Sequence, residues 1–570
     1  MKKITLLILL GFGFFLNINA QTSLLPKSFE TVPQQYVNNS IEITVEKQYL
    51  NIPIKNKSAK KKVTFIVDGK AEPENDIEIA DSEADWWAFR DISQYKGKKI
   101  TIIVNNALAS STFLKSIFQS DTIVGTHNLY SEKYRPQLHF TPRRGMKGDV
   151  NGLVYYDGEY HLFIQHNPYG VMWGNMHWGH AVSKDLVHWK ELPIALYPDK
   201  LGTMFSGTAA VDWTNSGGFQ TGSEKPIILA YAEAGNPITN GIAYSNDKGR
   251  TWTKYENNPV LPYFKNGNRD PKLFWYEKEN KWVMVLNTDH RDSTHYFVFS
   301  SKDLKNWKYM SEIPTKKTQE DCPELFEIPL QGKPNETRWV FYGGKADYYV
   351  GNFDGTSFSA ENGPNILNRG NSFYASLVFN DIPKTDGRLI LMPASGIPTP
   401  EMPFSGSVGL PVSLTLHQTS EGLRIFAYPV KELEQLRTTS INIKNKTVKS
   451  KLDALKNVKG ELFDILTEIE LKDAKTFTFT IKGIPLIYNV ERNELSYRNV
   501  KAKLVPVNGK ISLRMLIDRT SFDVFGNKGQ FYMPLGVMPD ENDNSISLTV
   551  EGGNIKVNSM DIYNLKSIWQ

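Results

Sequence analysis

Apolar and polar residues alternate in short runs along most of the chain, and helical periodicity is limited to short stretches such as Lys431 to Arg437. A period of two residues is typical of half-buried β-strands. Near the N-terminus, clusters of Asn, Lys, Gly and Pro separate the β-type runs Ile41 to Val45, Lys62 to Val67 and Lys98 to Val104. This pattern predicts a small N-terminal β-domain over residues 21–125.

Residues 130–432 carry an internal repeat. A Ser-x-Asp-x-x-x-Trp signature occurs at Ser183 to Trp189, again at Ser301 to Trp307, and with one inserted residue at Ser245 to Trp252. The units also contain predicted hairpins, and in the first unit an Asp157-Gly158 turn joins two β-rich runs. Units of about 50–65 residues with about four strands each are typical of propeller blades. The length of the region predicts five blades.

After residue 437 the repeat stops and simple alternation returns, for example in Lys475 to Ile481, Ser512 to Ile517 and Ser547 to Glu551. Such runs predict a C-terminal β-sandwich over residues 437–570. The expected fold class is therefore all-β, with a small N-terminal β-domain, a five-bladed propeller over residues 130–432 and the sandwich.

Composition and charge narrow the classes of function. Of the 570 residues, 40% are hydrophobic and 12% aromatic, which is enough for a large core and excludes a globally disordered chain. The net charge is only +5 and the two signs are interspersed. We therefore expect no nucleic-acid partner and a neutral substrate.

Neither the cysteine nor the histidines predict redox or metal chemistry. Cys322 is the single cysteine, so no intramolecular disulfide forms, and no histidine lies near it in sequence to activate it; we interpret it as a small buried apolar residue. Four histidines fall close together, on strand and loop segments: His161, His166, His177 and His180. Their spacing favours packing or sugar binding over zinc. We expect no catalytic metal and no cofactor.

The first 20 residues have the pattern of a secretory signal peptide. Lys2 and Lys3 precede the apolar run Ile4 to Leu16, and Ile18-Asn19-Ala20 forms a small-residue cleavage site. No other apolar run approaches the roughly 20 residues that span a membrane, so no transmembrane segment is expected. The pattern predicts a periplasmic or secreted protein and carries no signal for an oligomeric state.

Acidic residues stand at three of the predicted blade starts. If each blade opens with its innermost strand, the five candidate starts are Asp149, Ser206, Asp270, Asp321 and Phe373. Inner strands converge on the central channel, so the three aspartates would meet in one pocket. Glycoside hydrolysis needs such carboxylates, because one attacks or stabilises the anomeric carbon and another protonates the leaving oxygen. The alternative is that Asp before Gly, Pro or Asn only forms turns.

A series of motifs runs along residues 130–570. They are Tyr134 to Phe140, Asp149-x-Asn151-Gly152, Gln165 to Pro168, Trp178 to Asp185, Phe205-Ser206-Gly207, Arg269-Asp270-Pro271, Cys322-Pro323, Leu410 to Leu416 and Asp518 to Phe525. In this order they resemble the invertase, levanase and inulinase family, glycoside hydrolase family 32. The resemblance implies a five-bladed propeller, a β-sandwich, and hydrolysis of β-fructofuranosides with retention of configuration. The N-terminal β-domain is similar to extensions on some Bacteroides-type relatives.

The resemblance also implies a role for each matching residue. Asp149 would be the nucleophile, Asp270 would stabilise the transition state, and Asp321 would be the acid/base. Arg269 would keep Asp270 ionised. The residues that would line the site of the terminal fructose are Gln165, Asn151, Trp173 and Ser206. Blade packing and strand capping are the alternatives for the last two.

Two motifs depart from the family pattern. The family has Trp-(Met/Leu/Ile)-Asn-Asp-Pro-Asn-Gly where this chain has Met146-Lys147-Gly148-Asp149-Val150-Asn151-Gly152. The family has Glu before Cys-Pro where this chain has Asp321, whose proton would lie about 1 Å farther from the leaving oxygen, and small misplacements cost on the order of 10²-fold in rate. Strand alternation would turn Glu320 to the opposite face. Glu324 is the alternative acid/base.

Three hypotheses follow. The first is a retaining β-fructosidase that cleaves levan, inulin, fructo-oligosaccharides or sucrose, with exo-action favoured because the family's commonest pocket holds one terminal fructose. The second, motivated by the altered motifs, is a catalytically impaired fructan-binding protein on the same scaffold. The third is a propeller hydrolase with a different sugar preference, because Gly148 removes a side chain that would touch the substrate.

Overall fold

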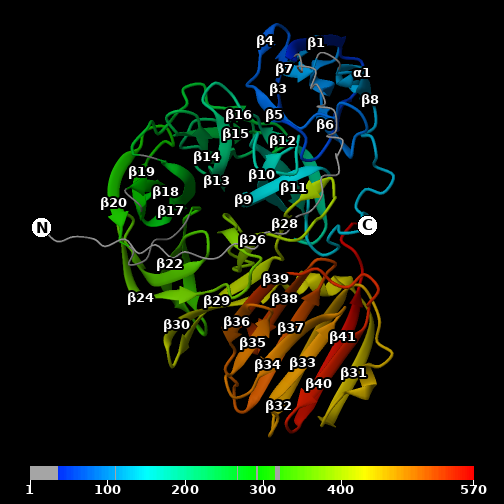
Figure 1. Ribbon diagram of the computed structural model, residues 1–570. Coiled ribbons are helices and arrows are strands. Elements are labelled where there is room, and N and C mark those ends of the chain that lie inside the picture. The colour runs from blue at the N-terminus through cyan, green and yellow to red at the C-terminus, as the bar shows by residue number, and fades with distance from the viewer. Residues whose placement is uncertain (1–35, 109–110, 266, 291–292, 315–320, 570) are drawn as a thin grey trace, which may run out of the picture.

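The computed structural model describes residues 36–108, 111–265, 267–290, 293–314 and 321–569. Nearly all of its regular structure is β-strand, arranged as N-terminal sheets, a ring of blades and a C-terminal sandwich (Figure 1). The predicted signal peptide and Glu320 lie outside the described residues. Within those residues, no helix is both long and apolar enough to cross a membrane.

Five blades of four antiparallel strands form the propeller, which confirms the prediction from the repeat. Blades 1 to 3 contain β9 (Gly145–Tyr156), β10 (Glu159–Asn167), β11 (His177–Ser183), β12 (Trp189–Leu196), β13 (Thr203–Val211), β14 (Ile227–Ala234), β15 (Thr239–Ser245), β16 (Thr253–Lys254), β17 (Arg269–Tyr276), β18 (Lys281–His290), β19 (Ser293–Ser301) and β20 (Lys308–Ile313). Blades 4 and 5 contain β21 (Glu324–Leu330), β22 (Lys333–Tyr342), β23 (Asp347–Phe353), β24 (Phe358–Ile366), β25 (Tyr374–Val378), β26 (Leu389–Ser395), β29 (Val412–Thr419) and β30 (Gly422–Pro429). The first strand of each blade begins at or near its predicted start.

The ring of blades closes between blade 5 and blade 1. The short strand β27 (Phe404–Ser405) pairs in parallel with β9, β28 (Ser407–Val408) pairs with β26, and Val154 bridges Asn380. The first strands also pack against one another, β9 on β13 and on β25, and β13 on β17. The channel is therefore lined by strand starts that are far apart in sequence.

The Ser-x-Asp-x-x-x-Trp repeat builds the turn between the third and fourth strands of three blades. In blade 1, Asp185 accepts two backbone N–H groups of the turn (3.0 and 2.8 Å), and Trp189 Nε1 donates to the Leu186 carbonyl (3.1 Å). Asp303 and Trp307 make the same contacts in blade 3. Because the third and fourth strands lie on the outer side of a blade, the repeat is structural and does not reach the channel.

Two small sheets precede the propeller, where the pattern predicts β-strands. Their elements are β1 (Tyr36–Thr44), β2 (Tyr49–Ile54), β3 (Lys61–Val67), β4 (Lys70–Ala71), β5 (Asn75–Ile77), β6 (Trp86–Asp91), β7 (Lys99–Leu108), the short helix α1 (Phe113–Ser116) and β8 (Phe118–Ser120). Tyr169 and Val171, from the loop after β10, pack into the core between these sheets. Asn175 of the same loop exchanges two hydrogen bonds with the Asp76 backbone, both of 2.8 Å. The N-terminal sheets are thus docked on blade 1.

A 3₁₀ helix, Lys431–Leu436, leads from blade 5 into a sandwich of a six-stranded and a five-stranded sheet. The strands are β31 (Arg437–Val448), β32 (Phe463–Leu471), β33 (Thr476–Ile481), β34 (Ile484–Asn489), β35 (Glu494–Tyr497), β36 (Val500–Lys503), β37 (Lys510–Ile517), β38 (Ser521–Gly526), β39 (Phe531–Gly536), β40 (Ile546–Glu551) and β41 (Ile555–Leu565). Each run predicted from alternation forms a strand. Phe525 and Tyr532 of the sandwich share one apolar core with Leu138 and Phe140, which precede the propeller.

Candidate active site

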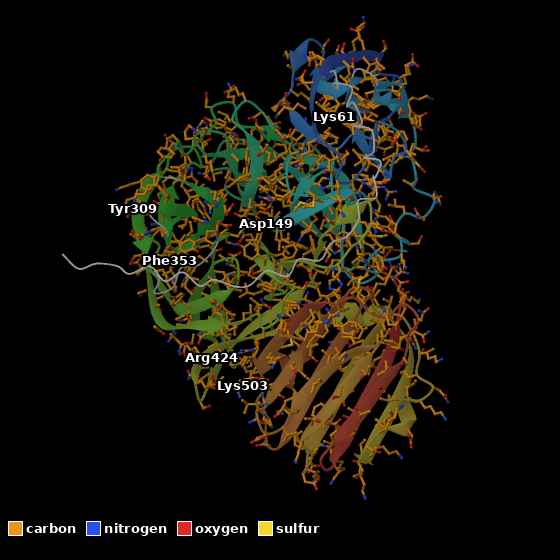
Figure 2. All side chains as sticks on the ribbon, viewed as in Figure 1. Lys61, Asp149, Tyr309, Phe353, Arg424 and Lys503 are labelled. Carbon is orange, nitrogen blue, oxygen red and sulfur yellow. The ribbon has the colours of Figure 1, made fainter. Side chains whose placement is uncertain are left out.

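The three aspartates predicted at blade starts come together inside the propeller. Asp149 lies on β9, Asp270 near the start of β17, and Asp321 just before β21. Cys322 links the first two, since its Sγ lies 3.8 Å from Asp149 Oδ2 and its N–H donates to Asp270 Oδ2 (3.2 Å). Figure 2 labels Asp149 toward the middle of the propeller and Tyr309, on the outermost strand of blade 3, at its rim. Closure of the ring gathers three carboxylates that sequence keeps apart.

Asp149 is held by a chain of hydrogen bonds. Ser206 Oγ donates to Asp149 Oδ2 (2.7 Å), and Gln165 Nε2 donates to Ser206 Oγ (2.7 Å). Burial raises the pKa of Asp149, while the Ser206 hydroxyl and the charge of Lys147 oppose that shift. Both the Ser206 and the Cys322 contacts fall on Oδ2, and Oδ1 accepts no hydrogen bond from the described residues. Oδ1 is therefore the atom available for attack on a sugar carbon.

Asp270 is the most enclosed of the three carboxylates, with 5% of its surface exposed. Its backbone adopts φ 56°, a left-handed conformation that is rare for a residue other than glycine and often marks a functional position. Burial, followed by the charge of Asp321, raises the pKa of Asp270 to about 8. Burial and the neighbouring carboxylates thus favour the protonated form of Asp270, which can donate a hydrogen bond.

Asp321 is the most exposed of the three, with 39% of its side-chain surface open. Its Oδ1 accepts from Arg269 at 2.5 and 3.2 Å and from Asn287 Nδ2 at 3.0 Å. Among the described residues, its Oδ2 accepts one longer hydrogen bond, from the Tyr374 hydroxyl (3.4 Å). One oxygen is thus anchored and the other faces the open side of the site, where a leaving group would stand.

Arg269 lies closer to Asp321 than to Asp270. Its Nε lies 3.7 Å from Asp270 Oδ2, beyond hydrogen-bond distance, whereas its Nη2 lies 2.5 Å from Asp321 Oδ1. The charge of Arg269 lowers the pKa of Asp270, as expected, but burial and the charge of Asp321 raise it by more.

Glu324, the alternative acid/base, lies on β21 and is fully buried. Lys272 Nζ is 2.6 Å from its Oε1, and the Val378 N–H donates to its Oε2 (3.0 Å). These contacts tie the inner strands of blades 3, 4 and 5 together. With both oxygens engaged and no exposed surface, Glu324 is placed to hold the propeller rather than to meet a sugar.

Comparison with protein families matches this chain in two adjoining segments. Residues 139–429 match the glycosyl hydrolases family 32 N-terminal domain, and residues 432–564 match the glycosyl hydrolases family 32 C terminal. The chain belongs to glycoside hydrolase family 32. The N-terminal sheets lie outside both matched segments.

Relatives within family 32 are similar over most of their length. The chain is 42% identical over 491 residues to a levanase of Bacillus subtilis, covering 77% of this chain and 72% of the relative. It is 28% identical over 520 residues to an extracellular exo-inulinase of Aspergillus niger, covering 77% and 96%. The crystal structure of an exo-inulinase from Aspergillus awamori matches with a TM-score of 0.70 at 26% identity, covering 77% of this chain and all of that one. Propeller and sandwich are thus the family fold.

Gly148, where this chain departs from the family 32 pattern, packs against Gln165. A Cβ built there would lie 3.0 Å from Gln165 Cβ and 3.1 Å from Gln165 Oε1. With no side chain at Gly148, Gln165 approaches β9 closely. The hypothesis that Gly148 changes the sugar preference stays a prediction.

Lys147 belongs to the site but was not among the predicted residues. It is 4% exposed, and burial lowers its pKa to about 7 against the opposing charge of Asp149. The sequence feature that could have indicated Lys147 is a lysine at a position where the family 32 pattern has an apolar residue. Asn287 and Tyr374 were also missed, because they become neighbours of Asp321 only when the blades assemble.

Two other predicted residues lie in different surroundings. Asn151 is fully buried. In the amide orientation that satisfies its neighbours, its oxygen accepts from Gln165 N (3.1 Å) and Trp178 Nε1 (3.2 Å), so it positions β10 rather than lining the open site. Trp173 is 58% exposed and meets Phe205 edge to face at 5.8 Å. Trp178 is blade core, and Trp173 is free to contact a ligand.

The four clustered histidines make packing contacts, as expected. His161 and His180 stack at 5.3 Å, and His166 and His177 each bond a backbone carbonyl. In the described ranges, no group of three or more His, Cys, Asp or Glu side chains is arranged to hold a metal ion. Cys322 is 3% exposed, and burial raises the pKa of its thiol, so the reactive thiolate is disfavoured.

Proposed function

We propose that this chain is a retaining β-fructofuranosidase that removes terminal fructose from fructans. The observation that carries the proposal is the cluster of Asp149, Asp270 and Asp321. From the described residues, Asp149 Oδ1 accepts no hydrogen bond and Asp321 Oδ2 accepts one long one, from the Tyr374 hydroxyl. Levanase and exo-inulinases among the relatives support this substrate class. The comparisons give no support to the hypothesis of an inactive fructan-binding protein.

The mechanism follows from these two oxygens. Asp149 Oδ1 attacks the anomeric carbon of the terminal fructose, while Asp321 Oδ2 gives its proton to the departing glycosidic oxygen. The C–O bond to the leaving group breaks as the bond to Asp149 forms. Asp321 then takes a proton from water, the water oxygen displaces Asp149 from the same carbon, and fructose leaves with its configuration retained.

The remaining site residues bind the sugar in this proposal. Protonated Asp270 donates to a fructose hydroxyl whose hydrogen bond strengthens in the transition state. Gln165 and Ser206 hold Asp149 in place, and Trp173 offers its exposed ring as an apolar wall. Arg269 fixes the position of Asp321 through its anchored oxygen.

The test incubates the mature protein, and its Asp149→Ala variant, with levan, inulin and sucrose. Fructose release by the wild type should fall at least about 10³-fold in the variant, since loss of a nucleophile removes the covalent step. The exposed Asp453 supplies a matched control, Asp453→Ala, which should keep full activity. Proton NMR of the first product should show the β-anomer. Oligosaccharides as first products would overturn exo-action, and the α-anomer would overturn retention.

Asp321 is tested through the leaving group. Asp321→Asn should lose about 10² to 10⁴-fold in kcat on sucrose, the usual contribution of general acid catalysis. A β-fructofuranoside with a nitrophenol leaving group, which departs without protonation, should lose far less. Equal losses on both substrates would contradict the assignment of Asp321 as the acid.

Export is part of the proposal. The segment 1–20 would direct the chain across the inner membrane, and its removal would release the mature protein into the periplasm or the medium. Fractionation of cells that express the full chain should place the activity outside the cytoplasm, and N-terminal sequencing should begin near Gln21. A cytoplasmic product that keeps Met1 would contradict it.

A further inference from the structure

A cavity of about 300 Å³ lies between the N-terminal sheets and blade 1. Its walls come from β2 and β6 on one side and from β10, β11 and β12 on the other. Side chains alternate along β10, so that Gln165 bonds Ser206 in the active site while Ile164 and His166 line the cavity. The cavity and the active site therefore lie on opposite faces of one strand.

The lining of the cavity combines aromatic rings with available hydroxyls. The aromatic residues are Tyr49, Phe89, Phe140, Tyr169 and Tyr197. The hydroxyls of Tyr49 and Tyr197 bond none of the described residues, and both side chains keep partial exposure. The rim is open, because Gln48, Lys190 and Pro193 are exposed there. Apolar rings beside a few polar groups are the usual composition of a small-molecule site.

The charges in the walls of the cavity are largely paired. Arg90 bonds Glu72 at 2.6 and 2.7 Å, Arg143 Nε lies 3.1 Å from Glu191, and Arg144 Nη1 lies 3.0 Å from Glu132. Each guanidinium of the wall thus has its carboxylate. Lys190, at the exposed rim, has no carboxylate partner among the described residues, so an anionic ligand would gain that cation but would also meet Asp91 and the paired carboxylates of the walls. A neutral polyhydroxylated ligand can bond the paired groups and the free tyrosine hydroxyls inside the cavity.

We propose that this cavity is a second, non-catalytic binding site for a fructosyl segment of the polymer whose end enters the active site. The proposal rests on the proposed function, which makes fructan the substrate. The volume accommodates one or two sugar rings, and the aromatic faces can carry the apolar C–H surfaces of those rings. A polymer held there keeps its ends at high local concentration near the propeller, which lowers KM for long chains but not for short ones.

The test uses the full chain with Asp149→Ala, so that titrated inulin-type oligosaccharides of about eight units are not consumed. Calorimetry should show two sites per chain. Adding Tyr49→Ala should weaken one of them about tenfold, a typical loss for an aromatic anchor. The control is Phe118→Ala, since Phe118 is also a partly exposed aromatic residue of the N-terminal sheets but does not line the cavity. This variant should keep both binding sites.

The catalytically intact chain gives the second readout. Tyr49→Ala should raise KM for levan or inulin about fivefold or more while leaving KM for sucrose and kcat unchanged, because only a long chain reaches both sites. Tyr197→Phe, which removes one hydroxyl and keeps the ring, should cause a smaller change in the same direction.

Three results would overturn the inference. They are a single site in the titration, equal behaviour of Tyr49→Ala and Phe118→Ala, and equally strong binding of maltoheptaose in the cavity. Failure of the wild type to release fructose from any fructan is a different result, and it would contradict the proposed function. Since the titration requires no turnover, the two failures can be told apart.

Discussion

The propeller carries β-structure at both ends of its sequence, and the two joins are built differently. The C-terminal sandwich shares one continuous apolar core with the propeller and encloses a buried ionic network at the boundary. The N-terminal sheets are joined through a loop of blade 1 and leave a cavity beside it. The fully packed C-terminal interface stabilises the fold. The N-terminal interface, which encloses a cavity and holds a loop of blade 1, shapes the surroundings of the active site.

The C-terminal join centres on His139. Its ring nitrogens contact Asp518 Oδ2 (2.7 Å) and Asp523 Oδ2 (3.0 Å), and Asp518 also accepts the N–H groups of Gln137 and Leu138. Burial disfavours the charged ring, but the two carboxylates outweigh it and raise the pKa of His139 to about 9. All three side chains are almost fully buried, so removal of one partner would leave an uncompensated charge.

The N-terminal join holds the loop that presents Trp173. Tyr169 and Val171 of this loop are packed in the core of the N-terminal sheets, and Asn175 bonds the Asp76 backbone. The loop is thus fixed on both sides of the exposed indole. Sheets outside the catalytic fold therefore determine where a proposed substrate contact stands.

The largest effect is expected at the C-terminal join. Asp518→Asn removes a charge from beneath His139 and should lower the free energy of unfolding by about 3–5 kcal/mol, the cost of breaking a buried ion pair. Chemical denaturation of the whole chain measures it, with the exposed Asp453→Asn as the control. If the free energy of unfolding fell by an amount within about 0.5 kcal/mol of the control, as for a surface substitution, the ion pair would not stabilise this interface as described.

The same network predicts a pH dependence. The pKa of His139 in the folded chain, about 9, is above that of an unfolded histidine, so its contribution is complete below about pH 6.5 and is lost as pH rises through about 9. Unfolding free energy should fall by about 3 kcal/mol over that window. His139→Asn should lack this slope, and the exposed His188→Asn should keep it. A slope in both variants would assign it to other groups.

A smaller effect is expected at the N-terminal join. Asn175 adopts φ 46°, so Asn175→Gly keeps the backbone conformation and removes only the side chain that holds Asp76. We expect KM for short fructo-oligosaccharides to rise about 2- to 10-fold, the cost of ordering the Trp173 side chain on binding. Asn215→Gly, at φ 53° in a blade 2 loop, is the matched control. Equal KM values for the two variants would show that the N-terminal sheets do not influence the active site.

The smallest effect is expected at the repeat, which belongs to neither join. Asp303→Ala removes the acceptor of two turn N–H groups on the outside of blade 3 and should cost about 0.5–2 kcal/mol of stability, as for loss of a capping group. Kinetic constants on every fructan should stay at the wild-type values. A fall in kcat would show that the repeat affects the geometry of the active site in the channel.

The local sequence pattern was sufficient to predict the strands, the repeat and the blade starts. Alternation and turn residues act over a few positions, and the left-handed Asp157-Gly158 turn joins β9 to β10 as predicted. The motif around Asp149 and the family resemblance also located Asp270, Asp321, Gln165 and Ser206 in one site. Ser206, Asp270 and Asp321 could be located because each stands at or near a predicted blade start, whereas Gln165 lies near the end of β10 and was located by the resemblance alone.

Tertiary structure decided how these residues divide their roles. Three contacts join partners on different blades or strands: Arg269 with Asp321, Glu324 with Lys272, and Gln165 with Gly148. Sequence spacing cannot rank such contacts, because burial and charge pairing depend on which side chains meet after the ring closes. The cavity at the N-terminal join arises in the same way, from two surfaces that only folding brings together.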